Sequence, residues 1–263
     1  DRWETTREYR LEQRYRELTG EQISSPGKRN KSSLFRKYAS VRLTFSERFD
    51  WDRMENSRWS AGFHSGNPRL VGNYSFTNEH QANNNGRNVH TSDGILTIHT
   101  VELPTRSLAW DVQKGFVERD FSYTSDIIQT SATFKQKYGI FSAKVRCSGG
   151  LNHALWLSGD KKLPHINIFH FDGTDITMGN AGQHKIDGVE ITGISEEQFF
   201  IYTLEWTPRA LVWYVNNLEV YRTTENIPQE ALYLGMNSFI PKKSEPATGK
   251  LEVDWIKVFE VRE

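Results

Sequence analysis

Short runs of alternating apolar and polar residues recur along the chain from about residue 43 to its end. The runs are broken by Gly, Asn, Asp or Pro, and no helical stretches lie between them. Because side chains alternate between the two faces of a strand, such runs predict half-buried β-strands joined by turns. The clearest runs are GILTIHTVEL, YGIFSAKVRC, HINIFHF, FIYTLEWTP, ALVWYVNNLEVYRT and GKLEVDWIKVFEV. The pattern predicts an all-β domain over residues 43–263, folded as a two-sheet antiparallel sandwich or jelly roll.

Residues 1–42 follow a different pattern and are rich in Arg and Glu. Leu11, Tyr15 and Leu18 have the spacing of neighbours on one face of a helix. A TTRE capping box precedes them and a glycine follows them, as expected at the two ends of a helix. We therefore predict a helical N-terminal extension, followed by a basic, turn-rich linker with the sequence SSPGKRNKSS.

Two strand-like runs predict more specific features. In LVWYVNNLEVY, Asn216 and Asn217 can adopt the positive φ angles of a tight hairpin turn. In LPHINIFHFDG, His165 and Asn167 share one face of a strand, and the alternation then slips by one residue to reach His170. Polar groups that crowd one face of an apolar strand either hydrogen-bond to each other or line a site. These three polar residues are therefore our first candidate site.

Aromatic residues make up 13% of the chain, including eight Trp and ten Tyr. Such a content suits a β-sheet core, and it also suits a sugar-binding surface on which flat rings stack against pyranoses. Trp110 lies in a polar connection, SLAWDV, and is the best candidate for a sugar platform. Trp156 in HALWL is the next candidate, with Trp59 behind them. A Trp in a strand pattern is more often a core residue, so this expectation is weakest for Trp156.

Charge and cysteine content argue against several classes of partner. The 33 Lys and Arg residues balance 33 Asp and Glu residues, so no overall field attracts nucleic acid or an anionic membrane. The single cysteine, Cys147, excludes an intrachain disulfide and a multi-thiolate zinc site. No apolar run of about 18 residues exists, so we expect no transmembrane segment. The first residues, DRWETT, lack the pattern of a signal peptide.

The order of the motifs resembles glycoside hydrolase family 16, which includes laminarinases, lichenases, agarases, porphyranases and carrageenases. The matching segments lie between residues 46 and 261 and are ERFDWDRMENSRW, NVHTSDGILTIHT, YTSDIIQT, YGIFSAKVR, HALWLSGD, FIYTLEWTPRALVWYVNNLEVYRT and LEVDWIKVFEV. The segment KGFVERDFSYTS is more similar to the algal-galactan branch. The resemblance implies a concanavalin A-like jelly roll that binds a polysaccharide or oligosaccharide, in an extracellular, periplasmic or cell-surface location.

In that family, the strand after the ALWL segment carries the motif EIDxxE, with a nucleophile Glu, an assisting Asp and an acid/base Glu. The chemistry needs two carboxylates about 5 Å apart. The matching residues here are His165, Asn167 and His170, so the resemblance implies a cleft whose catalytic carboxylates have been lost. We expect a polysaccharide-binding protein without retaining glycosidase activity, in effect a pseudo-glycosidase.

Two alternatives give the same three residues a chemical role. A polysaccharide lyase or an atypical glycosidase would use His170 as base, Asn167 to neutralise a uronate carboxylate, and Tyr138 or Tyr123 as acid. A metal site would instead combine His165 and His170 with His184 in NAGQHK, since imidazoles suit zinc, copper or nickel. His184 is also a candidate binding residue.

Other candidate residues lie outside this strand. Asp254 matches a position where the resemblance implies a calcium ligand, although Arg48 replaces an acidic residue there and argues against the ion. No other cofactor is expected. Arg69, Arg87 and Asn88 could contact sugar hydroxyls, a sulfate or a carboxylate through bidentate hydrogen bonds.

Overall fold

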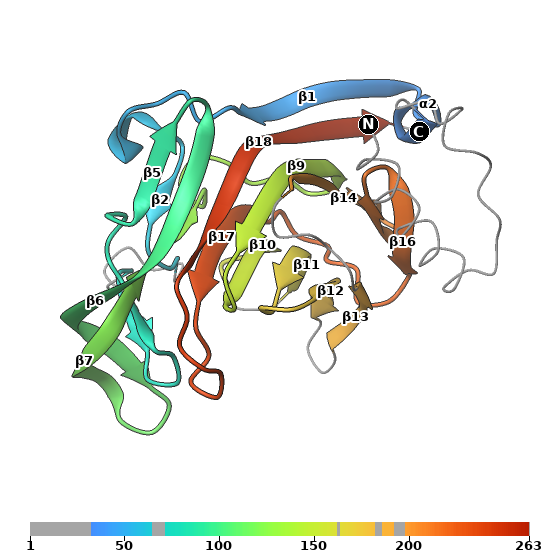
Figure 1. The fold of residues 1–263 in the computed structure, drawn as a ribbon. Helices are drawn as coiled ribbons and strands as arrows, with labels where there is room; N and C mark the ends of the chain where they lie inside the picture. The colour runs from blue at the N-terminus through green and yellow to red at the C-terminus, as the bar shows by residue number, and fades with distance from the viewer. Residues whose placement is uncertain (1–32, 65–71, 162–163, 182–185, 192–197, 263) are drawn as a thin grey trace.

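The computed structural model describes residues 33–64, 72–161, 164–181, 186–191 and 198–262. Over these residues the chain forms two β-sheets that pack face to face (Figure 1). This arrangement confirms the predicted all-β sandwich. The helix predicted near the N-terminus, together with Arg69 and His184, lies outside the described residues. The first described strand begins at Ser40, and the proposed domain boundary near residue 43 stays a prediction.

The smaller sheet has the strand order β13, β12, β11, β10, β17, β8, β2, and all of its neighbours are antiparallel. It contains the strand with the three polar candidates. Its strands are β13 (Ile186–Ile191), β12 (Ile176–Ala181), β11 (His165–Phe171), β10 (Asn152–Ser158), β17 (Tyr233–Phe239), β8 (Ile127–Gln129) and β2 (Ser60–Ala61).

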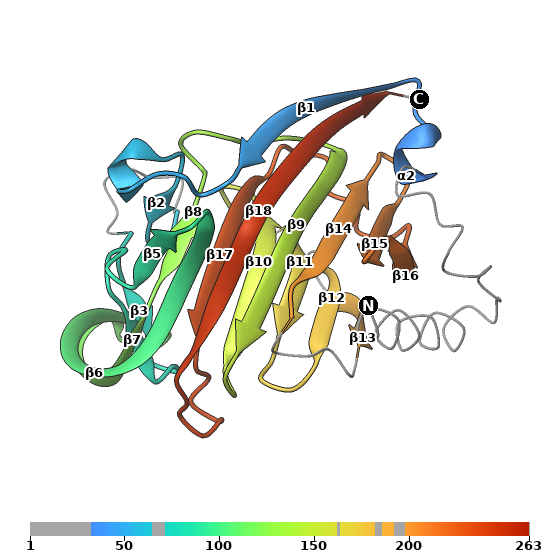
Figure 2. The ribbon, with the colours of Figure 1, turned by 45° about the horizontal axis from the view of Figure 1, so that its top comes forward.

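The larger sheet has the order β16, β15, β14, β9, β18, β6, β7, β4, with β1 paired to β18 and with β3 and β5 paired to β6. In Figure 2, β18, β9 and β14 run side by side in front of β10, β11 and β12. The strands are β1 (Ser40–Glu47), β3 (Ser75–Phe76), β4 (Gln81–Asn83), β5 (Val89–Ser92), β6 (Ile95–Asp111), β7 (Gly115–Ser125), β9 (Gly139–Ser148), β14 (Phe200–Trp206), β15 (Leu211–Val215), β16 (Leu218–Thr223) and β18 (Gly249–Arg262).

Helical structure among the described residues is limited to α2 (Ser33–Arg36) and a 3-10 turn, η2 (Met54–Asn56). Neither segment is long and apolar enough to cross a membrane. The predicted hairpin is confirmed: β15 and β16 are joined at Asn216 and Asn217, whose φ angles are 48° and 66°.

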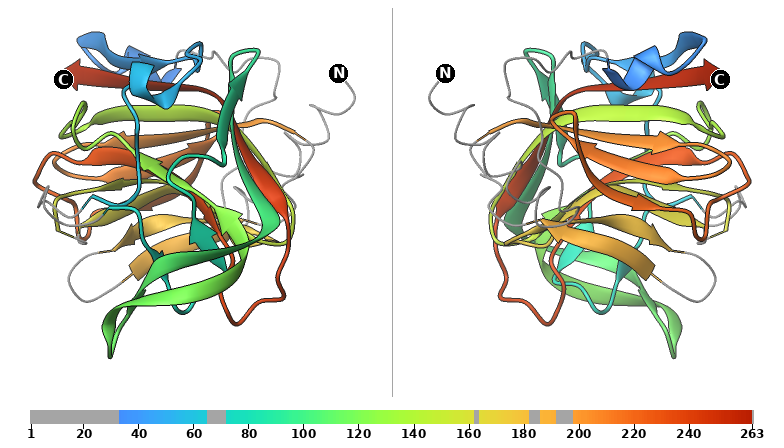
Figure 3. Two further views of the ribbon diagram at one scale, coloured as in Figure 1. Left: turned by 90° about the vertical axis from the view of Figure 1, so that its left-hand side faces the viewer. Right: turned by 90° about the vertical axis from the view of Figure 1, so that its right-hand side faces the viewer.

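The core lies between the two sheets and is built from alternate residues of their strands. Ile166 and Leu157 from the smaller sheet, and Val145 and Trp213 from the larger one, are at most 1% exposed. Because these positions point inward, the residues between them on β10 and β11 point to the opposite face of the smaller sheet. The long β6 and β7 strands form a ribbon that projects beyond the sandwich (Figure 3).

Candidate functional site

A cleft of about 620 Å³ opens on the outer face of the smaller sheet. Its size lies within the roughly 300 to 1,000 Å³ that is typical of ligand sites. Strands β10, β11 and β17 form its floor, and residues just before and after β3 form a wall. It is lined by Phe63, His64, Tyr74, Phe76, Glu79, Ile127, Ala154, Trp156, Ser158, Gly159, Asp160, Lys161, His165, Asn167, His170, Tyr233, Asn237 and Phe239.

A β-bulge in β11 brings the three polar candidates into this cleft. On β10, Leu155 pairs with Phe169 and Trp156 pairs with Asn167, so Ile168 has no partner of its own. The extra residue reverses the alternation, which lets His170 line the same cleft as Asn167. The slip predicted from the sequence is confirmed.

The bulge is held from the other side of the core. Bulges interrupt the hydrogen-bond ladder and can leave a backbone carbonyl without a strand partner. Trp213 on β15 of the larger sheet donates its Nε1–H to the backbone oxygen of Asn167 at 2.8 Å. Trp213 is fully buried, so this hydrogen bond fixes the position of the bulge relative to the facing sheet.

The three polar side chains already have hydrogen-bond partners. Nε2 of His165 donates to Oδ1 of Asn167 at 2.8 Å. The amide of Asn152 donates to Nε2 of His170 at 2.7 Å. Burial lowers the pKa of both histidines below the ordinary value. Both rings are therefore neutral near pH 7.

Trp156 lies across the centre of the cleft floor. Its strand neighbour on β17 is Gly235, and a Cβ atom at Gly235 would lie 2.2 Å from the indole ring. The glycine thus lets the ring approach the backbone of β17 closely. The indole Nε1–H donates to Oδ1 of Asn237 at 3.0 Å, and the ring centroid lies 5.5 Å from that of His165. Trp156 is a half-buried, fixed aromatic surface, as a sugar platform requires.

A chain of aromatic contacts extends from the cleft wall to the β6–β7 ribbon. Phe63 lies 4.7 Å from Tyr74 between ring centroids, and Tyr74 lies 5.3 Å from Phe116. Phe116 in turn lies 4.9 Å from Trp110. Trp110 is half-buried on β6 and is not among the described residues that line the cleft. It lies at the outer end of the aromatic chain, so it can serve only a ligand that extends past the cleft wall.

Glu79 is a cleft residue that sequence reasoning missed. It lies in the turn after β3, and an isolated β-bridge joins it to Pro241, just after β17. Nε2 of Gln81 donates to its Oε2 at 2.7 Å, and burial raises the pKa of Glu79 to about 7. The segment TNEHQ has the composition of an ordinary turn, and its tertiary contacts with residues 240–242 place it in the cleft.

Asp160 is the other carboxylate among the described residues that line the cleft. Its Oδ1 accepts hydrogen bonds from Nζ of Lys135 at 2.6 Å and from Nε2 of His64 at 2.8 Å. The lysine, and to a lesser extent the histidine, lowers its pKa. Asp160 is therefore an exposed, ionised group that is already paired.

Other predicted residues lie elsewhere. Trp59 is 3% exposed in the core and donates its Nε1–H to Glu47. Tyr138 donates its hydroxyl to Oε1 of Gln229 and contacts Trp206, and neither Tyr138 nor Tyr123 lines the cleft.

Arg87 and Asn88 form part of a loop outside the cleft. Arg87 is exposed, whereas Asn88 is buried and its amide donates to Oγ1 of Thr124 and to the backbone oxygen of His99. Neither residue is brought together with the three polar candidates on β11.

The predicted calcium ligand, Asp254 on β18, lies 2.6 Å from Nζ of Lys144. The lysine supplies the positive charge that a cation would bring, so these residues do not fit a calcium site. Among the described residues, no group of three or more His, Cys, Asp or Glu is arranged to hold a metal ion.

The inner face of β10 carries a buried histidine, His153, in contrast to the histidines that line the cleft. It is fully buried, Nδ1 lies 2.7 Å from the hydroxyl of Ser238, and Nε2 lies 3.0 Å from the backbone oxygen of Ser148. Burial lowers its pKa to about 4. His153 is a neutral structural residue beneath the cleft.

The family description "Glycosyl hydrolases family 16" matches residues 76–257. An endo-1,3-1,4-beta-glycanase, EglC, from Rhizobium meliloti is 25% identical over 64% of this chain and 38% of its own length. A xylanase/beta-glucanase from Ruminococcus flavefaciens is 34% identical over 67% of this chain and 21% of its own length. The chain therefore spans well under half of these relatives.

Solved structures show the same fold. The catalytic domain of an endo-1,3-beta-glucanase (laminarinase) from Thermotoga petrophila superimposes with a TM-score of 0.67 at 19% identity, covering 85% of this chain and 99% of that domain. The endo-beta-1,3-glucanase from Pyrococcus furiosus superimposes with a TM-score of 0.66, also at 19% identity, over 84% of this chain and 95% of that one. Given the match over residues 76–257, the chain belongs to glycosyl hydrolase family 16.

Proposed function

We propose that the chain binds a β-linked polysaccharide in the cleft and does not hydrolyse it by the retaining mechanism. The observation that carries this proposal is that β11 presents His165, Asn167 and His170 to the cleft, and none of these side chains is a carboxylate. By the resemblance to family 16, they take the positions of the three carboxylates of the EIDxxE motif. Retaining hydrolysis needs a nucleophilic carboxylate about 5 Å from a second carboxyl group. A neutral imidazole is a poor substitute for the nucleophile at a sugar carbon.

The remaining carboxyl groups of the cleft support this proposal. Among the described lining residues these are Glu79 and Asp160. Asp160 is engaged by Lys135 and His64. Burial raises the pKa of Glu79 to about 7, which disfavours the ionised form that a nucleophile requires.

The aromatic surfaces support binding of a sugar chain. Trp156 offers a fixed ring on the cleft floor, and Phe63, Tyr74 and Phe76 form an aromatic wall. Rings of this kind stack on the apolar faces of sugars without needing catalytic groups. The names of the relatives refer to β-glucans and xylan, so a β-glucan is the first ligand to test. An algal galactan is the second, because of the segment KGFVERDFSYTS.

The lyase alternative has less support. Oδ1 of Asn167 accepts from His165, and Nε2 of His170 accepts from Asn152, so both groups are committed to internal hydrogen bonds. The acid that this alternative assigned, Tyr138, contacts Gln229 and Trp206 and does not line the cleft. Binding therefore ranks above replaced catalysis.

The proposal is tested by affinity gel electrophoresis with laminarin, lichenan, xylan and agarose, run beside assays for reducing ends and for unsaturated uronate products. We expect retardation by at least one β-glucan and no new product. Arg42→Ala, an exposed change on β1, is the control, and its mobility relative to a glycan-free gel should fall as much as that of the wild type. Release of reducing ends that His170→Ala abolishes would overturn the proposal. Absence of retardation by all four polysaccharides would also overturn it.

A further inference from the structure

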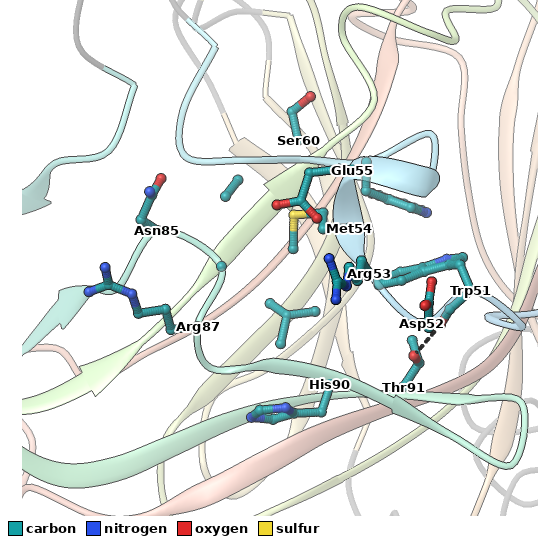
Figure 4. Close-up of a pocket in the computed structure, with 14 residues that line it drawn as sticks. Trp51, Asp52, Arg53, Met54, Glu55, Ser60, Asn85, Arg87, His90 and Thr91 are labelled. Carbon is teal, nitrogen blue, oxygen red and sulfur yellow. Dashed lines mark hydrogen bonds between the residues drawn. The ribbon is translucent and has the colours of Figure 1, made fainter.

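A second hollow of about 670 Å³ lies at the edge of the sandwich, beside strands β2 and β5 (Figure 4). One side is formed by residues 51–61 and the other by residues 85–91. The hollow shares no lining residue with the cleft. The two are nevertheless close along the chain, because Ser60 and Ala61 of β2 line the hollow and Phe63 and His64, just after β2, line the cleft. We call it the edge hollow.

A buried carboxylate fixes one side of the edge hollow. Asp126 is 0% exposed and accepts hydrogen bonds from the backbone N–H groups of Asn84, Gly86 and Asn88 at 2.9 to 3.0 Å. At Gly86, φ is +82° and an added Cβ would lie 3.0 Å from Cε of Met54 on the opposite side. The loop is thus held close to the floor of the hollow without help from a ligand.

A second buried carboxylate fixes the other side. Glu47 is 6% exposed and accepts hydrogen bonds from the backbone N–H of Phe49 at 2.8 Å and from Nε1–H of Trp59 at 3.1 Å. Thr91 on β5 donates its hydroxyl to the backbone oxygen of Trp51. Both sides are therefore rigid before binding, which lowers the entropic cost of recognition.

The floor is apolar, but it contains an unsatisfied donor. Trp51, Met54 and Val89 are at least half-buried there. Nε1 of Trp51 is buried and has no hydrogen-bond acceptor among the described residues. A buried unpaired N–H is unfavourable, and a movement of the Trp51 ring that brought this N–H to an acceptor on a bound ligand would relieve it.

The rim carries charged side chains that are not paired with other described residues. In Figure 4, Arg53 and Glu55 face Asn85 and Arg87 across the hollow, and His90 lies below them. The side chains of Arg53, Glu55 and Arg87 make no hydrogen bond or ion pair with the described residues, and all three are exposed. Donors and acceptors thus surround a space large enough for a sugar residue.

We propose that the edge hollow is a second carbohydrate-binding site that takes one or two residues of a neutral β-glucan. Two arginines on the rim are balanced by Asp52 and Glu55, so the hollow offers no net positive charge to an anion. A sugar hydroxyl both donates and accepts, and therefore suits such a mixed set of groups. The choice of a β-glucan as the ligand rests on the function proposed for the cleft. The geometry of the edge hollow is independent of that function.

The test uses the indole N–H resonances of the tryptophans in the isotope-labelled full chain, titrated with laminaritetraose. The resonances of Trp51 and Trp156 are assigned by their loss in Trp51→Phe and Trp156→Phe. We expect both resonances to shift, each with its own saturation curve. In Arg53→Ala/Arg87→Ala, the dissociation constant from the Trp51 resonance should rise by about tenfold or more, while that from Trp156 stays unchanged. Arg42→Ala serves as the matched arginine control.

Each outcome separates the second site from the cleft. A shift of Trp156 alone overturns the second site and leaves the proposed function standing. A shift of Trp51 alone supports the second site and counts against glucan binding in the cleft. If neither resonance shifts, the second site is overturned and glucan binding in the cleft is contradicted, while the four-polysaccharide gels decide the proposed function separately. A sulfated κ-carrageenan oligosaccharide that shifts Trp51 more strongly than laminaritetraose would overturn the assignment of a neutral ligand.

Discussion

The cleft and the edge hollow have similar volumes but treat their polar groups in opposite ways. In the cleft, His165 bonds to Asn167, His170 to Asn152, and Trp156 to Asn237. In the edge hollow, the side chains of Arg53, Glu55 and Arg87 have no such partners among the described residues.

The difference indicates which interactions would supply the binding free energy in each region. A ligand that bonds to Nε2 of His165 or of His170 must replace a hydrogen bond that already exists, so the net gain from these two atoms is small. Aromatic contact displaces only water and needs no such exchange. We therefore expect stacking to dominate in the cleft and hydrogen bonding to dominate in the edge hollow.

The largest effect is expected from Gly235→Ala, which acts on the platform of the cleft and not on the edge hollow. The added Cβ would lie 2.2 Å from the ring of Trp156, so the ring must move. Overpacking of this kind costs about 1–3 kcal/mol of unfolding free energy, and the displaced ring should also abolish retention by laminarin. Urea unfolding and affinity electrophoresis measure the two effects. Gly150→Ala, whose Cβ would lie 3.9 Å from its nearest neighbour, is the matched control.

Trp156→Ala is expected to have the next largest effect, confined to binding. Loss of the stacking surface should weaken laminarin affinity by about 1–3 kcal/mol, roughly fivefold to 150-fold. Trp255 on β18 is also half-buried, and Trp255→Ala should leave the affinity unchanged. Equal losses from the two variants would show that Trp156 acts through stability and not through contact.

His170→Ala should weaken laminarin binding by less than Trp156→Ala does, about 0.5–1.5 kcal/mol, because the histidine already bonds to Asn152. Isothermal titration of both variants gives the comparison directly. If His170→Ala costs more than Trp156→Ala, hydrogen bonding dominates in the cleft and the proposed contrast with the edge hollow fails.

The smallest effect is a pH dependence caused by Glu79. Its folded pKa of about 7 lies above the ordinary value of 4.5, so its contribution to stability is complete below pH 4.5 and is lost as the pH rises through 7. Enclosure by a neutral glycan disfavours the charged form further, so affinity should fall several-fold between pH 6 and 8. Glu79→Gln should remove this dependence. Burial lowers the pKa of His165 and of His170, which reduces their contribution to this pH dependence.

The sequence predicted the features that depend on local pattern. Alternation predicted the sandwich, and the slip between Asn167 and His170 predicted the bulge. The platform at Trp156 was harder to predict, because it depends on Gly235 from a strand distant in sequence. A glycine in the strand pattern LYLGMNS was the available signal, since it marks a close approach.

Features assembled from loops could not be predicted. Glu79 enters the cleft through the contacts of its segment with residues 240–242, and the edge hollow depends on Asp126, which accepts hydrogen bonds from three backbone N–H groups of another segment. Trp110 was chosen because its segment reads as a polar connection, whereas the structure places it on strand β6, where it is half-buried. Trp59 was chosen by residue type, and it lies in the core just before β2.

The hydrogen bond from Trp213 to the backbone of Asn167 fixes the course of β11 without involving any side chain of that strand. The backbone of β11 is anchored to the opposite sheet through an oxygen that every amino acid possesses. Side chains at positions 165, 167 and 170 can therefore be exchanged during evolution or design while the directions in which they point are retained. The same anchored strand could thus host a hydrolytic, a binding or a newly designed set of side chains.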